Sequence, residues 1–167
     1  MGFTYYWDVT RTTSPSSFKK LCEVAGQLHS DVEVTDTTFV VYFDDAEWIE
    51  FSNAVQGWQF CKTNRGPDDL PACAILRYAK QIYQDGIDVS CDDDTEEYLS
   101  RGDDLLKGAL EQIAALKIQK ALKAYYAKRT AAARIIQARW EATAYDPARP
   151  LCVSRLTKKI SMCPLAH

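Results

Sequence analysis

The stretch from Leu105 to Ala144 constrains the fold of this chain more than any other part of its sequence. It contains one glycine, Gly108, and no proline, and it is rich in Ala, Lys, Arg, Gln, Leu and Ile. These residue types favour helix, and a helix without breakers continues for many turns. Pro147 then requires the helix to end before it. The sequence therefore predicts a long helix over residues 107–145, followed by an irregular tail over 146–167.

Charge separates this helix from the residues that precede it. Residues 1–106 carry twenty acidic and eight basic side chains, a net charge of −12. Residues 107–167 carry twelve basic and three acidic side chains, a net charge of +9. Such asymmetry is typical of a folded body with an appendage that binds an acidic partner. We therefore expect one acidic domain over 1–106 and a basic extension after it.

The acidic domain shows mixed periodicity. Alternating apolar residues over 3–9 predict a strand, and Ser14 followed by Pro15 predicts the start of a helix over 15–29. The other expected elements are strands over 32–34, 38–43, 47–51 and 87–91, and helices over 67–84 and 98–106, while 53–66 is ambiguous. The order β-α-β-β-β-α-β-α predicts an α+β fold, followed by the long basic C-terminal helix.

Composition argues against several functional classes. No apolar run approaches the roughly 18 residues of a membrane helix, and the amino terminus does not resemble a signal peptide, so we expect neither a membrane nor a secreted protein. The six cysteines show no Cys-x-x-Cys spacing and there are two histidines, which favours free thiols over a metal site. Phosphate-binding glycine loops and hydrolase motifs do not occur. We therefore predict no catalytic residues, metal or cofactor, and the case for an enzyme is weak.

One short segment of the domain has the composition of an anion site. Lys62, Thr63 and Arg65 precede the helix expected over 67–84, where backbone N–H groups and the helix dipole attract anions. Cys61 lies beside Lys62, whose charge would lower the pKa of the thiol. An anion-binding or enzymatic domain centred on Cys61–Arg65 is one hypothesis. The alternative is that these side chains make structural polar contacts.

The basic helix contains a more specific pattern. Ile118-Gln119 is followed by Lys123 and Ala124, and then by Lys128-Arg129. Over residues 117–129 this resembles the calmodulin-binding IQ motif, with alanine in place of the usual glycine. An amphipathic helix of this kind lays its apolar side chains into a Met-rich groove, and its bases pair with an acidic rim. The resemblance implies a calmodulin-like EF-hand partner, bound by Ile118, Gln119, Leu122, Lys123, Tyr126, Lys128 and Arg129.

Two other partners suit a basic helix. It can associate with itself or dock on its own or a neighbouring acidic domain, as in a viral structural or assembly protein. It can also bind nucleic acid, with bases neutralising phosphates and rings stacking on exposed nucleobases. The side chains for that role are Lys120, Lys123, Lys128, Arg129, Arg134 and Arg139, with Tyr125, Tyr126 and Trp140.

Two resemblances concern the origin of the chain. Arg134–Trp140, with Asp146-Pro147 and the Cys152–Leu156 stretch, is similar to an element of uncharacterised proteins from large amoeba-infecting DNA viruses, over about residues 131–160. It implies a viral protein of the host cytoplasm or the virion. Gly2–Trp7 and Cys61–Asp69 resemble a bacterial and phage domain of unknown function, over residues 2–106. That resemblance implies a fold unit without a known activity.

Overall fold

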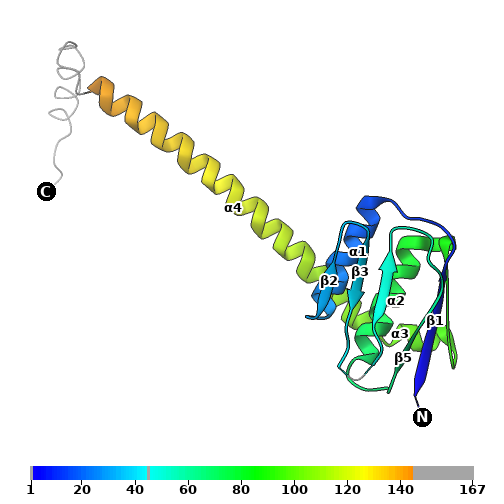
Figure 1. Ribbon diagram of the computed structural model, residues 1–167. Helices are drawn as coiled ribbons and strands as arrows, with labels where there is room; N and C mark the ends of the chain where they lie inside the picture. Colours follow the sequence, from blue (N-terminus) through cyan, green and yellow to red (C-terminus); the bar gives the residue numbers. More distant parts are fainter. Residues whose placement is uncertain (1, 45, 145–167) are drawn as a thin grey trace, which may run out of the picture. The chain divides into compact units, whose positions relative to one another are not determined.

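The computed structural model describes residues 2–44 and 46–144 (Figure 1). It confirms the predicted α+β class with a long C-terminal helix. The tail predicted over 146–167 lies outside the described residues. The chain divides into two compact units, Met1–Leu116 and Lys117–His167. The first unit contains both sheets and the core, and we describe the second by itself.

A three-stranded antiparallel sheet is built around the first strand. β1 (Phe3–Val9) lies between β5 (Gly57–Thr63) and β6 (Ile87–Cys91). Alternate side chains of β1 are buried, because successive residues of a strand point to opposite faces of its sheet. β5 lies in the segment over 53–66 that the sequence left ambiguous.

A second antiparallel sheet has the strand order β2-β3-β4, formed by β2 (Val32–Val34), β3 (Thr38–Val41) and β4 (Ile49–Ser52). It confirms the three strands predicted over 32–34, 38–43 and 47–51. Packed rings join this sheet to the first: Phe51 stacks on Trp7 at 5.6 Å between ring centroids and on Phe39 at 5.5 Å. The two sheets therefore share one aromatic core.

Two helices supply most of the remaining core. α1 (Pro15–Leu28) begins as predicted, with the Ser14 hydroxyl accepting from the Ser17 amide at 3.1 Å. α2 (Asp69–Tyr83) packs against α1 and leads through the short 3-10 helix η1 (Gln84–Gly86) into β6. Five consecutive residues of α2, from Ala72 to Leu76, are fully buried. α2 thus lies in the interior of the unit.

The helix expected over 98–106 is two helices. α3 (Thr95–Ser100) ends before Gly102, and α4 (Asp103–Ala144) begins directly after it, earlier than the predicted start at 107. Gly102 lies so close to α2 that an added Cβ would come within 2.5 Å of the Ala74 nitrogen. Leu106 and Ala109 are buried, so the first turns of α4 complete the core. No helix in the described residues has the length and apolar character needed to cross a membrane.

Candidate functional site

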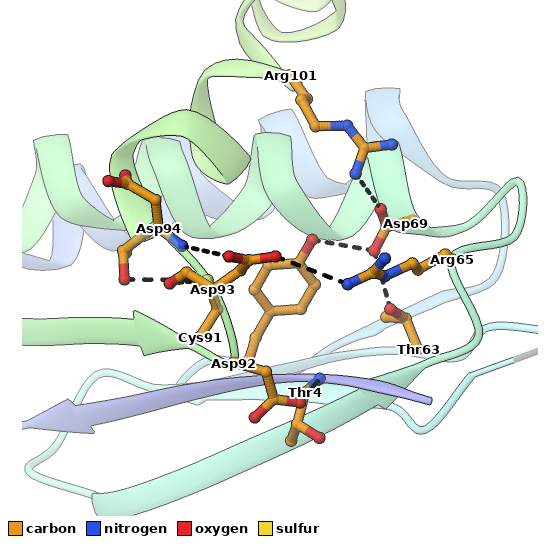
Figure 2. A network of polar contacts seen from close by, with 11 residues as sticks. Thr4, Thr63, Arg65, Asp69, Cys91, Asp92, Asp93, Asp94 and Arg101 are labelled. Atoms are coloured by element: carbon orange, nitrogen blue, oxygen red, sulfur yellow. Dashed lines mark hydrogen bonds and ion pairs between the residues drawn. The ribbon is translucent and has the colours of Figure 1, made fainter. Parts of the chain in front are cut away.

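A buried cluster of polar side chains in the first unit is centred on the carboxylate of Asp69, at the start of α2 (Figure 2). It is 1% exposed. One oxygen accepts from the Tyr5 hydroxyl at 2.9 Å and from the Thr63 hydroxyl at 2.8 Å. The other accepts from an Arg101 guanidinium nitrogen at 3.0 Å. Both oxygens of this buried charge are thus hydrogen-bonded, as a buried carboxylate requires.

Tyr5 and Cys73, which lie beside Asp69, stay protonated at neutral pH. Burial raises the pKa of Tyr5 far above its ordinary value, and Cys73 and Asp69 add to this rise. Cys73 lies with its sulfur 2.9 Å from the Tyr5 hydroxyl, and its burial raises the pKa of the thiol to about 11. A neutral thiol is a poor nucleophile. The cluster joins β1, β5, α2 and the residue after α3, so its geometry favours a structural role.

The predicted anion-site residues do not converge. Thr63 is buried and donates to Asp69, whereas Lys62, one position away on the strand, is exposed. Arg65 has left-handed backbone, φ 55°, and its guanidinium lies 4.8 Å from the centroid of the Phe3 ring. It also lies 3.8 Å from an oxygen of Asp93. This arrangement gives no support to an anion site, and it matches the alternative of structural polar contacts.

The expectation of a low-pKa thiol at Cys61 is wrong. Cys61 is fully buried, and its sulfur donates to the Glu47 carbonyl oxygen at 3.0 Å. Burial, together with the charges of Glu47 and Asp69, raises the pKa of this thiol to about 12. Lys62 does not offset these effects because its side chain lies on the opposite face of β5. The thiol is therefore un-ionised at neutral pH.

The acidic side chains before α3 and in its first turn make structural contacts. Asp92 accepts from the Thr4 amide at 2.8 Å and from the Tyr6 hydroxyl at 3.0 Å, and these bonds lower its pKa. Asp94 caps α3 by accepting from the Glu97 amide at 3.0 Å. Glu96 pairs with Arg77 at 2.7 Å. Within the residues that the structure describes, no group of three or more metal-ligating side chains forms.

The second candidate surface is the part of α4 beyond Leu116. Its described residues are exposed except Ala144, which is half-buried. Large apolar side chains stand in solvent along it: Ile118 is 63% exposed, Leu122 50% and Tyr126 60%. The remaining predicted partner-binding residues are also exposed: Gln119, Lys123, Lys128 and Arg129. Exposed apolar surface of this extent is typical of an interaction site.

The apolar residues of this segment repeat with the helix period. Ile118 and Ile136 are eighteen residues apart, which is five turns of an α-helix, so they lie on one face. Leu122 and Trp140 repeat at the same interval on that face. Tyr125 lies between the two pairs, where its ring packs edge-on against Tyr126 at 5.6 Å between centroids. The segment thus carries an apolar stripe, which we define as Ile118, Leu122, Tyr125, Ile136 and Trp140.

Two features were not predicted from the sequence. The Asp69 cluster joins residues 64 and 32 positions apart, and no local pattern signals such contacts. Trp58 and Phe60 on β5 are 61% and 47% exposed. Their alternation with Gln59 and Cys61 is a usable strand signal. That signal predicts that the aromatic face of the strand is buried, whereas in the structure the face with Gln59 and Cys61 points to the core.

Comparison with known proteins gives no relative: no protein family, curated protein or solved structure matches this chain. The resemblances drawn from the sequence therefore stay predictions.

Proposed function

We propose that this chain is a non-enzymatic protein-interaction module whose basic amphipathic helix binds an acidic, calmodulin-like partner. The observation that supports the proposal is the apolar stripe of α4, whose side chains are each at least half exposed. Water contact with so many large apolar groups is unfavourable, at about 25 cal/mol per Å². A partner groove that covers the stripe would recover this free energy.

Charge indicates the chemistry of the partner. Residues 112–140 contain seven bases and no acid. Lys120 and Lys123 lie on the side of the helix away from Ile118, at about 100° per residue. A groove with apolar walls and an acidic rim would accept the stripe and pair with the bases, as calmodulin-like lobes do with their target helices. The IQ-like spacing from Ile118 to Arg129 favours the same class of partner.

The test is size-exclusion chromatography with light scattering, on the full chain alone and with calmodulin, with and without calcium. We expect a one-to-one complex that weakens as salt increases. Ile118→Asp should weaken binding by about 2–4 kcal/mol, roughly thirtyfold or more, because it replaces an apolar side chain of the stripe with a charge.

The matched control is Leu116→Asp. Leu116 is 57% exposed, close to the exposure of Ile118, but it lies about 200° around the helix. It should leave the complex intact. The proposal fails if no complex forms with or without calcium, or if both substitutions weaken binding equally.

A further inference from the structure

The outward face of the β5-β1-β6 sheet carries an unusual set of side chains. Its register places Tyr6 opposite Phe60 of β5, and Asp8 between Trp58 of β5 and Asp88 of β6. The neighbouring residues of β1 point into the core. These five side chains therefore lie together on one face, which we call the outer sheet face.

Three of these side chains form a ring cluster, in which Trp58 and Phe60 are exposed and Tyr6 is half-buried. Trp58 stacks on Tyr6 at 5.7 Å between centroids, with an interplanar angle of 23°. It also contacts Phe60 at 5.4 Å. The solvent side of an antiparallel sheet is ordinarily polar. A cluster with Trp58 at 61% exposure is therefore an apolar surface with no partner in the described residues.

Two carboxylates face each other beside the rings. Asp8 and Asp88 are directly opposite on adjacent strands, an arrangement that destabilises a sheet. Within residues 2–44 and 46–144, neither side chain has an ion pair or hydrogen bond. A bound cation would relieve this repulsion. Carboxylates beside aromatic rings are the surroundings that bind Lys and Arg side chains, through charge and cation–π attraction.

The chain itself contains a ligand of this chemistry, the basic segment over 117–139. We propose that the outer sheet face binds residues 117–139 of a second copy of this chain. Charge complementarity carries the assignment, because the face presents Asp8 and Asp88 against one base, Lys62, and the segment has seven bases and no acid. The inference rests on the proposed function in one respect, namely that this helix binds an acidic surface of a protein.

The contact joins two different surfaces, so it is heterologous. Each molecule then keeps one free outer sheet face or one free helix after pairing, and assembly continues unless a ring closes. Light scattering should give a mass above the 18.9 kDa of the monomer that increases with protein concentration. High salt should return the monomer.

Two variants separate the surfaces. Trp58→Ala combined with Asp88→Asn removes the ring and the charge from the outer sheet face, and it should weaken assembly about tenfold or more. Lys120→Glu combined with Lys123→Glu reverses charge on the helix and should have a similar effect. Mixing the two variants restores one compatible pair of surfaces. We expect a one-to-one dimer of twice the monomer mass that grows no further.

The control for the face is Trp48→Ala with Asp36→Asn. Trp48 is 57% exposed and its ring contacts none of the three clustered rings, and Asp36 is exposed. This variant should assemble like the unmodified chain. The inference is overturned by a chain that is monomeric at all concentrations, by assembly that ignores the face variant, or by a mixture that gives no dimer.

Calmodulin binding distinguishes this inference from the proposed function. The face variant should bind calmodulin like the unmodified chain, whereas Ile118→Asp should bind it about thirtyfold or more weakly. Loss of assembly with calmodulin binding retained isolates the outer sheet face as the second site. If the chain assembles as predicted but does not bind calmodulin, the proposed partner is refuted and the inference about the outer sheet face is retained.

Discussion

Two glycines in neighbouring turns have opposite roles. Gly102 lies against α2, where an added Cβ would be 2.5 Å from the Ala74 nitrogen and 2.8 Å from its Cα. Backbone atoms cannot move aside as a side chain does. Gly108, inside α4, has no atom within 4 Å of the same added Cβ. Packing against α2 requires glycine at position 102, whereas Gly108 makes no such contact and only weakens the helix.

These surroundings predict opposite effects of the same substitution. Gly102→Ala should lower the free energy of unfolding by about 2–3 kcal/mol, because α2 and the residue before α4 must separate. Gly108→Ala should raise it by about 0.5–1 kcal/mol, because alanine loses less backbone entropy in a helix. Urea denaturation of the two variants measures both. A Gly102→Ala variant as stable as the unmodified chain would contradict the packing at this joint.

At the scale of elements, a strand or helix was predictable from the sequence where its buried face is also its more apolar face. β1 is of this kind, with Phe3, Tyr5 and Trp7 buried. β5 is ambiguous in sequence because its more apolar face is the exposed one. Trp58 and Phe60 face solvent, while Gln59 points toward the core. Only the pairing with β1, a contact distant in sequence, decides which face is buried. Local periodicity does not contain that information.

The candidate sites divide in the same way. The long helix was predicted because its signal is local, in the composition and spacing of its residues, and its role as a binding site stays a prediction. The Asp69 cluster was not predicted, because Tyr5 and Arg101 reach it only through the register of β1 and the position of Gly102. The low-pKa thiol predicted at Cys61 failed for a related reason: burial outweighs the neighbouring lysine.

The long helix contributes to the core only through its first turns. Every buried residue of α4 precedes Lys117 in the part of the chain that the structure describes. A chain ended after Leu116 should therefore keep its free energy of unfolding within about 1 kcal/mol at low protein concentration. Urea denaturation compares the shortened and full chains. A loss of several kcal/mol would mean that the residues after Leu116 help to hold the fold.

At the scale of the whole molecule, buried thiols make stability depend on alkaline pH. Burial raises the pKa of Cys61 to about 12 and of Cys73 to about 11, from an ordinary 9.0. Below pH 9 both states keep these protons. Between pH 9 and the raised values the unfolded chain loses them and the folded chain does not, so the free energy of unfolding falls as pH rises.

Urea denaturation across this range tests the dependence. The free energy of unfolding should be flat from pH 7 to 8 and should fall by about 1 kcal/mol for each buried thiol by pH 10. Cys61→Ala should start from a lower stability and decline less steeply, since one titrating group is gone. A decline of equal slope in both proteins would show that Cys61 is not responsible.

The five-turn repeat of the apolar stripe gives the helix a translational symmetry. A groove that accepts Ile118 and Leu122 meets Ile136 and Trp140 in the same orientation after sliding about 27 Å along the axis. The two registers share the isoleucine but differ in shape, because Trp140 stands where the first has Leu122 and Thr143 stands where it has Tyr125. Charge separates them, because Glu141 stands where the first register has a lysine. An acidic partner of the kind proposed would therefore favour the first register, and added salt would reduce that preference.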